Sequence, residues 1–202
     1  MKNTVTLFVI IAGCFINVYS QQSGTFIDIR DNRTYKWVEI GTQVWMAENL
    51  KFNAKGSRIY DGFSNNFNRY GKLYLWETAQ EVCPDGWHLP GIDEWHALIN
   101  SYGKIYDENG KIPYKELTKT QKEEISQRYK EAFLVFQEGG ASGFNILYGG
   151  YHKDHEYSGG GTIAGFWSSD DHEKKVFIEF SVIKNTEFSV RCVKNIEETI
   201  EE

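Results

Sequence analysis

The chain has 202 residues, of which 41% are hydrophobic and 15% are aromatic, and this composition can supply the core of one globular domain. Its formal net charge at pH 7 is −6, which disfavours electrostatic binding to nucleic acid or to an anionic lipid surface. The sequence contains neither a Gly-x-Ser-x-Gly elbow nor a Gly-rich phosphate loop, so it lacks the motifs of a serine hydrolase or a P-loop enzyme.

The first 20 residues have the pattern of a secretory signal peptide. A short positive start precedes an apolar run from Val5 to Ile16, which is too short to cross a bilayer because a spanning helix needs about 20 residues. Cleavage is expected after Ser20. In a second interpretation, Ile11-Ala-Gly-Cys14 is a bacterial lipobox and Cys14 carries a lipid anchor. Both interpretations predict that residues 21–202 are secreted or held in the cell envelope, in an oxidising space.

Two cysteines, Cys83 and Cys192, remain after the leader is set aside. In an exported protein such a pair is expected to form a disulfide. The bond would join a helix in the middle of the chain to the last strand.

The first third of the mature chain predicts an antiparallel meander. Segments 25–30, 35–40 and 43–47 are rich in β-branched and aromatic residues, and Asp-Asn-Arg and Gly-Thr sequences separate them. The segment Asn53 to Asn68 is expected to be a loop, because it is rich in Asn, Gly and Ser.

Two short helices are predicted next. The first begins at Trp76 and ends near Cys83, before Pro84. The second covers residues 92–102, with Gly103 as the expected C-cap. One face of this second helix is formed by Ile92, Trp95, Leu98, Ile99 and Tyr102.

A third helix is predicted within an insertion around 104–136. A polar surface excursion comes first, and Thr120 with Glu123 then matches a capping box. The helix is expected from residue 121 to about 134. Its buried stripe would consist of Ile125, Tyr129, Ala132, Phe133 and Phe136.

Glycine pairs and triplets divide the last third into short strands. These strands are expected at 145–148, 163–168, 176–183 and 188–193. The long loops between them are the expected place for binding residues, because loops on a rigid sheet commonly carry function. The acidic tail 197–202 is expected to be frayed.

Five segments of this sequence resemble the Fibrobacter succinogenes major paralogous domain. They are residues 35–50, 71–76, 83–90, 166–169 and 188–194. The resemblance covers nearly all of the chain after the leader. It implies an α+β, C-type-lectin-like fold of antiparallel strands with two short helices, to which this chain adds an inserted helix. It also implies the same pairing of Cys83 with Cys192.

One position departs from the family pattern. The family favours Thr, as N-cap of the second helix, where Gly91 stands here. Glycine offers no side-chain oxygen to the free N–H groups of the first turn, so a weaker cap is expected.

Calcium-dependent sugar binding of the lectin type is disfavoured. The sequence lacks the Pro-containing triplets of those lectins, and Trp167-Ser-Ser-Asp170 lacks their Asn-Asp pair. A calcium site that uses Asp170 or Asp171 stays open. His152, Asp154 and His155, or Asp170, Asp171 and His172, have donor types that suit zinc or copper. A polar loop face is the preferred interpretation, and no cofactor is expected.

The ligand site is expected on one exposed face formed by loops 139–161 and 167–172. Tyrosine and tryptophan give rigid contact area to such a site, and Tyr148 could join it, whereas Phe166 and Trp167 are expected to pack the sheet. The candidate ligand-binding residues are Tyr151, His152, Asp154, His155, Tyr157 and Asp170.

The sequence therefore predicts a secreted or surface-anchored bacterial binding module for a glycan or a protein. No catalytic residues are assigned. The alternative is a structural or adhesive envelope protein without a discrete pocket. An enzyme comes third, since only analogy with other proteins of the fold supports it.

Overall fold

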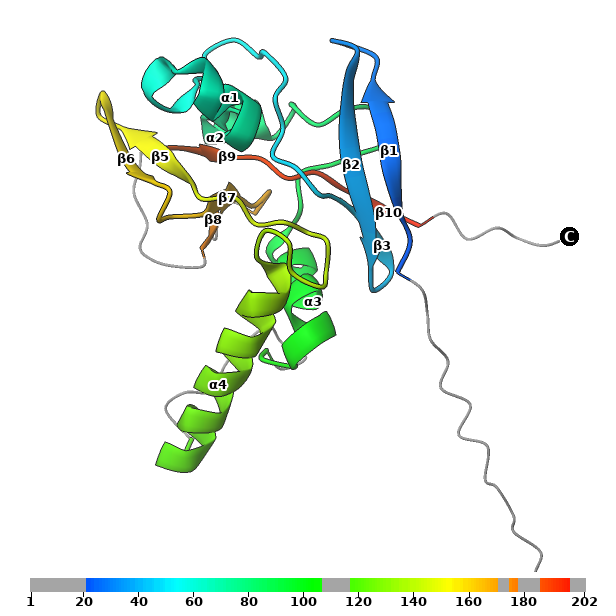
Figure 1. Ribbon diagram of the computed structural model, residues 1–202, viewed down its shortest axis with the longest axis vertical. Coiled ribbons are helices and arrows are strands. Elements are labelled where there is room, and N and C mark those ends of the chain that lie inside the picture. The colour runs from blue at the N-terminus through cyan, green and yellow to red at the C-terminus, as the bar shows by residue number, and fades with distance from the viewer. Residues whose placement is uncertain (1–20, 107–116, 171–174, 178–185, 197–202) are drawn as a thin grey trace, which may run out of the picture.

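The computed structural model describes residues 21–106, 117–170, 175–177 and 186–196 (Figure 1). The predicted leader with Cys14, part of the excursion before the third helix, Asp171, His172 and the acidic tail lie outside the described residues. The described part is α+β, with two sheets and few helices.

The first sheet contains the predicted meander. Its strands run antiparallel in the order β1-β2-β3-β10. They are β1 (Ser23–Asp28), β2 (Arg33–Ile40), β3 (Gln43–Met46) and β10 (Val193–Asn195). Side chains of β2 and β3 alternate between the two faces. Val38 and its partner Trp45 enter one core, whereas Tyr35 and Met46 enter another.

The second sheet has the order β6-β5-β9-β7-β8, and β4 also pairs with β9. Its strands are β4 (Leu73–Tyr74), β5 (Gly149–Lys153), β6 (Glu156–Gly160), β7 (Gly165–Trp167), β8 (Lys175–Phe177) and β9 (Thr186–Ser189). The pairing of β7 with β9 is parallel, and the others are antiparallel.

Two strand predictions in this region need correction, and a third is described only in part. Segment 145–148 forms only a bridge from Ile146 to Gln137, and the β5–β6 hairpin that follows was not predicted. The expected strand 188–193 is divided between β9 and β10, which belong to different sheets. The expected strand 176–183 begins as β8, and its remainder lies outside the described residues.

Helical structure begins at Tyr60, inside the loop that the sequence predicts over 53–68, whereas residues 53–59 form no helix. The helices are η1 (Tyr60–Gly62), α1 (Ser64–Tyr70), α2 (Trp76–Ala79), α3 (Ile92–Gly103) and α4 (Lys119–Phe136). Gly71 ends α1 with a φ of 72°, and its N–H donates to the Phe67 carbonyl. This left-handed position suits glycine, which has no Cβ to clash.

Both predicted caps of the long helices are displaced along the chain. Thr118, rather than Thr120, is the N-cap of α4: its Oγ1 accepts from the Gln121 N–H at 3.3 Å, and the Gln121 side chain accepts from the Thr118 N–H. At the end of α3, Gly103 is still helical and Lys104 takes the left-handed conformation with a φ of 45°.

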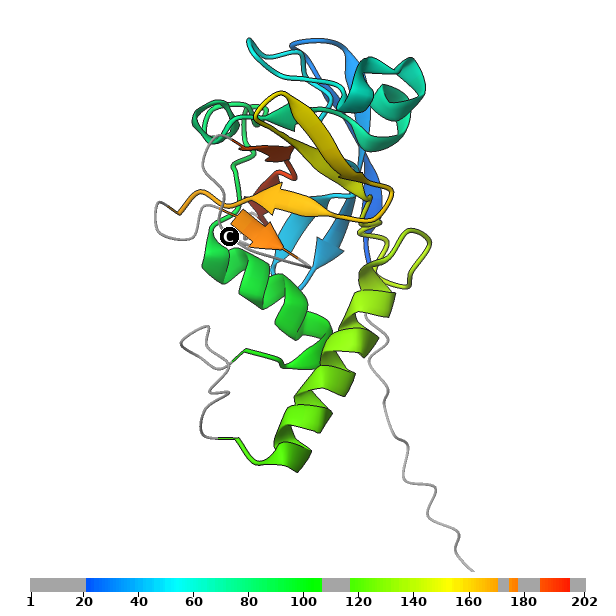
Figure 2. The same ribbon diagram turned by 90° about the vertical axis from the view of Figure 1, so that its left-hand side faces the viewer.

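Two hydrophobic cores organise the protein. The helical core contains Val38, Ile40, Trp45, Ala47, Trp95, Leu98, Ile105, Ala132, Phe136, Phe144, Ile146, Ala164, Phe166 and Val193. The disulfide core contains Tyr35, Met46, Leu50, Tyr74, Ala79, Val82, Leu89, Trp167, Phe188, Val190 and Cys192. The predicted stripe of α4 faces the helical core, with Ala132 and Phe136 fully buried. Figures 1 and 2 show the N-terminal part of α4 projecting away from the sheets.

Consecutive residues of the last segment connect these cores. Cys192 forms the predicted disulfide with Cys83, with a Cα–Cα distance of 5.8 Å. Arg191 is fully buried and donates hydrogen bonds of 2.6 to 3.0 Å to Asn49 Oδ1 and to the carbonyls of Met46, Phe144 and Asn145. Burial lowers the pKa of Arg191 to about 9, so the guanidinium stays charged at neutral pH.

Candidate functional site

The β5–β6 hairpin carries most of the predicted ligand-binding residues. Tyr151 and His152 lie on β5, and Tyr157 lies opposite His152 on β6. Asp154 and His155 form the turn between the strands, with φ values of 47° and 71°. These turn residues are exposed, so the hairpin presents polar side chains at its tip.

Two of these candidates pack into the protein. The Tyr151 ring is half-buried at the margin of the disulfide core, 5.8 Å from the ring of Phe188. His152 is 6% exposed, and its Nδ1 lies 3.4 Å from Glu187 Oε1. Neither side chain forms an open platform in this structure, and their roles in binding remain predictions.

A cluster of polar and aromatic side chains joins the hairpin to β9 and η1. Its members are Arg58, Tyr60, His152, Tyr157 and Glu187. Arg58 donates to Glu187 Oε1 at 2.8 Å, and this hydrogen bond raises the pKa of Arg58. The ring of Tyr157 lies 5.3 Å from that of Tyr60 and 4.7 Å from that of His152. Glu187 is 4% exposed, so this carboxylate acts as an internal anchor and is not open to a ligand in bulk water.

Asp170 lies elsewhere and caps α3. Its Oδ2 accepts from the Ile92 N–H at 2.6 Å and from Ser168 Oγ at 2.9 Å. A Cβ placed on Gly91 would lie 3.3 Å from the same oxygen. The carboxylate therefore takes the place of the missing N-cap side chain, and its charge suits the positive end of the helix. The Glu94 carboxylate also accepts from the Gly91 N–H, at 2.7 Å. The sequence predicts a weaker cap at Gly91, and the structure adds acceptors from Asp170 and Glu94 at this end of α3.

The described histidines and carboxylates do not assemble a metal centre. Within residues 21–106, 117–170, 175–177 and 186–196, no group of three or more His, Cys, Asp or Glu side chains is placed to hold an ion. Across the same ranges, no helix has the length and apolarity needed to cross a membrane.

A groove of about 350 Å³ lies between α4 and the turn after β6. It is lined by Tyr129, Lys130, Phe133, Tyr148, Thr162, Ile163 and Ala164. Its volume is within the range of small-ligand sites, and aromatic walls with a few polar groups are typical of such sites. The rings of Phe133 and Tyr148 meet at 6.4 Å in an edge-to-face arrangement. Partial burial raises the pKa of Tyr148, so its hydroxyl is a neutral hydrogen-bonding group at pH 7.

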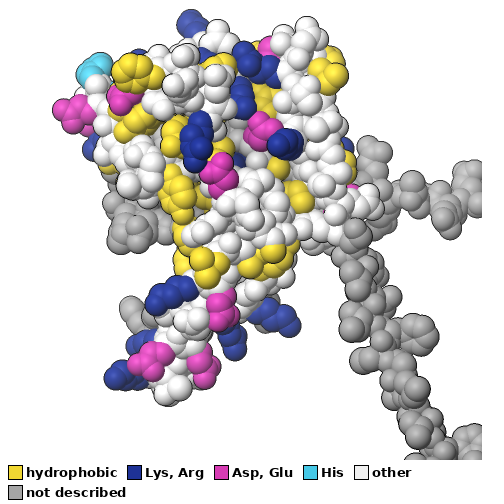
Figure 3. Space-filling view, viewed as in Figure 1, with side chains coloured by type: hydrophobic (Ala, Val, Ile, Leu, Met, Phe, Trp, Pro, Cys, Tyr) yellow, Lys and Arg dark blue, Asp and Glu magenta, His cyan; other side chains and the backbone are white. Residues whose placement is uncertain are grey.

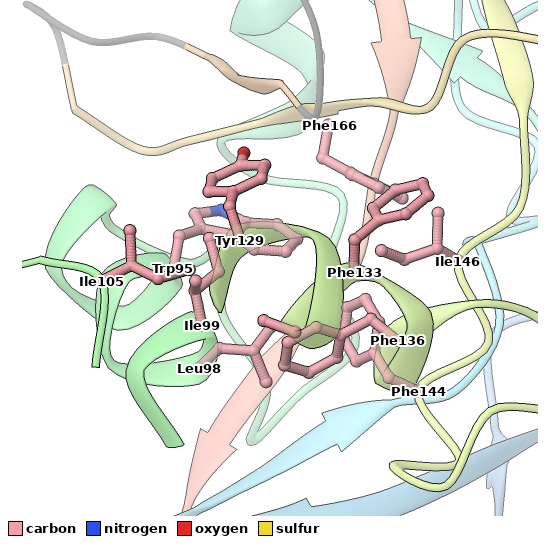
Figure 4. A pocket seen from close by; sticks show the side chains of 11 residues that line it. Trp95, Leu98, Ile99, Ile105, Tyr129, Phe133, Phe136, Phe144, Ile146 and Phe166 are labelled. Carbon is pink, nitrogen blue, oxygen red and sulfur yellow. The ribbon is translucent and has the colours of Figure 1, made fainter. Parts of the chain in front are cut away.

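An apolar cavity of about 40 Å³ adjoins the groove (Figure 4). Tyr129 and Phe133 line both spaces, and Figure 4 shows them projecting from α4 toward the helical core. An apolar cavity tends to stay free of water. The groove therefore has a loosely packed apolar floor.

The sequence predicts only part of this groove. It offers Tyr148 as a binding aromatic, whereas Tyr129 and Phe133 fit the buried stripe of α4. The predicted binding residues do not include Lys130, Thr162, Ile163 or Ala164. Lys130 precedes Phe133 by three positions, so the two side chains lie on the same side of α4. This spacing is the signal that places Lys130 beside an aromatic residue of the groove.

Comparison with known proteins relates the chain to one family. The sequence model of the Fibrobacter succinogenes major domain matches residues 38–194, which include the described strands of the second sheet and the groove, whereas β1 and most of β2 lie before the match. No curated protein and no solved structure matches the chain. Because the match spans well over half of the sequence, the chain belongs to the Fibrobacter succinogenes major domain family.

Proposed function

We propose that this protein is a secreted or surface-anchored bacterial binding module of C-type-lectin-like architecture, and that its groove holds a short glycan. The groove between α4 and the turn after β6 carries this proposal. Tyr129, Phe133 and Tyr148 offer ring faces and edges to the apolar side of a sugar, while Lys130 and Thr162 offer hydrogen bonds to its hydroxyl groups.

The composition of the lining supports binding rather than catalysis. The described lining residues include no carboxylate and no imidazole, which are the usual partners in general acid–base chemistry. Export to an oxidising compartment is supported by the predicted leader and by the Cys83–Cys192 bond.

A structural or adhesive role is a second candidate, favoured by the edge of the first sheet. Ile27 on the edge strand β1 is 61% exposed, and Ile29 just after it is 79% exposed. Exposed apolar residues at a sheet edge are suited to contact with another protein. A protein ligand on this edge would leave the groove unused.

Blocking the groove tests the proposal. Thr162 is exposed at the groove wall, so Thr162→Trp should fill the space without removing core contacts. On an array of neutral and acidic oligosaccharides, the chain from residue 21 onward should bind at least one glycan. We expect Thr162→Trp to lower that affinity at least about tenfold, because a bulky ring would exclude the ligand.

Thr34→Trp is the matched control, because Thr34 is exposed on β2 in the other sheet. It should leave glycan binding unchanged. If Thr162→Trp binds as well as the unaltered chain, the site lies elsewhere, with the hairpin tip as the next place to test. A chain that binds no glycan but captures an envelope protein through the Ile27 edge would establish the second candidate.

A further inference from the structure

The charges of α4 are distributed unevenly around its axis. At 3.6 residues per turn, Lys122, Ser126, Lys130 and Phe133 fall within an arc of about 80°. Glu124 and Glu131 fall on the side opposite Phe133, as does Arg128. Since Phe133 and Lys130 line the groove, the basic side of the helix continues the groove wall.

Lys122 and Lys130 share this side with the Lys119–Glu123 pair. Neither forms an ion pair within the part of the chain that the structure describes, whereas Lys119 lies 3.9 Å from Glu123. Lys130 is exposed and is the charged residue of the described groove lining. In a protein with a net charge of −6, these two lysines thus place positive charge at and beside the groove.

The spacing of the two lysines suits an extended ligand. Eight positions along a helix correspond to about 12 Å, which exceeds the reach of a single small anion. Figure 3 shows hydrophobic side chains where α4 meets the sheets, and both basic and acidic side chains along its projecting part. A chain bound along the side that carries Lys130 and Lys122 would therefore meet aromatic rings near the sheets and these two cations farther along the helix.

We infer that the groove selects glycans that carry several negative charges, as carboxylate or sulfate groups, and that Lys130 and Lys122 contact those groups in succession. This inference rests on the proposed function of the groove. The aromatic residues contact the sugar rings, and the lysines distinguish acidic chains from neutral ones.

Titration calorimetry with matched probes tests the inference. The probes are an oligogalacturonate, the same oligomer with its carboxyl groups reduced to alcohols, and a heparin-derived oligosaccharide as the sulfated case. We expect the reduced oligomer to bind at least about tenfold more weakly than the acidic one. Raising the salt concentration to about 1 M should remove most of this difference, because the Debye length falls to about 3 Å. The tighter of the two acidic probes identifies the anionic group.

Charge variants assign the effect to one side of α4. Lys130→Gln and Lys122→Gln should each weaken binding of the preferred acidic probe by about twofold to fivefold, as expected for exposed ion pairs. Arg128→Gln removes the same charge from the opposite side and should change nothing.

Three results would overturn the inference and leave glycan binding in the groove intact. They are equal affinity for the acidic and reduced oligomers, an equal loss in Arg128→Gln and Lys130→Gln, or equally tight binding of single-stranded DNA. If no oligosaccharide binds, or if binding is insensitive to Thr162→Trp, the proposed function of the groove fails as well.

Discussion

The two cores of this protein satisfy their polar groups to different extents. In the disulfide core, Trp167 donates to the Tyr74 carbonyl at 2.6 Å, and the Tyr74 hydroxyl donates to the Phe52 carbonyl at 2.8 Å. In the helical core, the buried indole N–H groups of Trp45 and Trp95 have no hydrogen-bond partner among the described residues. Buried donors without partners cost free energy.

The helical core is also less tightly packed than the disulfide core. The disulfide core is closed by a covalent bond, whereas the helical core contains the apolar cavity and adjoins the groove. Voids forfeit contacts that a close-packed interior would make. The Cys83–Cys192 bond thus stabilises one side of the protein, and the groove lies on the other, where the adjoining cavity leaves side chains room to move.

Removing the disulfide should have the largest effect on stability. Cys83 and Cys192 are 109 positions apart, and closing a loop of this length is worth about 4 to 5 kcal/mol in the chain-entropy model. We expect Cys192→Ser to lower the free energy of unfolding by about 4 kcal/mol, measured by guanidinium denaturation without reductant. Reduction of the unaltered chain should cause a similar loss. Two reactive thiols in the native, unreduced chain would refute the bond itself.

Arg191→Met should come next, because Arg191 holds the boundary between the two cores. Methionine fills similar volume but donates nothing, so three carbonyls and the Asn49 side chain lose their donor. We expect a loss of about 3 kcal/mol in the free energy of unfolding. Arg128→Met on the exposed side of α4 is the control and should change stability by less than about 0.5 kcal/mol. Equal stability of the two variants would show that the carbonyls find other donors.

Asp170→Ala should lower the free energy of unfolding by less than the two changes above. It acts at the start of α3, the helix that supplies Trp95 and Leu98 to the helical core. The change removes the oxygen that accepts from the Ile92 N–H at the start of α3. We expect a loss of about 1 kcal/mol, as for other N-caps. Asp170→Asn keeps an acceptor and should lose less than Asp170→Ala. A binding role for Asp170 would instead appear as lost glycan affinity at unchanged melting temperature, and that result would contradict the capping role.

Short sequence patterns predicted the elements that depend on residues close together in the chain. The meander follows from β-branched residues and turns, and the disulfide follows from the number of cysteines left after the leader. The start of α4 was placed two residues late because Thr118 and Thr120 each precede Gln or Glu by three positions. Two overlapping capping boxes cannot be distinguished without the surrounding structure.

The β5–β6 hairpin was not predicted because its strands contain several glycines. Gly150 has a φ of 66°, and a Cβ there would lie 2.5 Å from the Ser158 carbonyl oxygen, while a Cβ at Gly160 would lie 2.5 Å from the Tyr60 ring. These glycines allow close approach of the backbone, although in sequence they indicate a loop. The cap from Asp170 to α3 joins residues 78 positions apart, so no local pattern could reveal it. The groove was missed because Tyr129 and Phe133 fit a core stripe equally well.

Both sheets need strands from the C-terminal end of the chain, so folding cannot be completed until that end is present. β9 lies between β5 and β7 and also pairs with β4, and β10 completes the first sheet beside β3. Neither sheet can close until residues 186–195 are present, because long-range strand pairing must wait for both partners. For a chain that leaves the cell N-terminus first, the segment that completes the fold is also the last to emerge. If the proposed export takes place, we expect the fold and the Cys83–Cys192 bond to be completed only after the last strands have emerged.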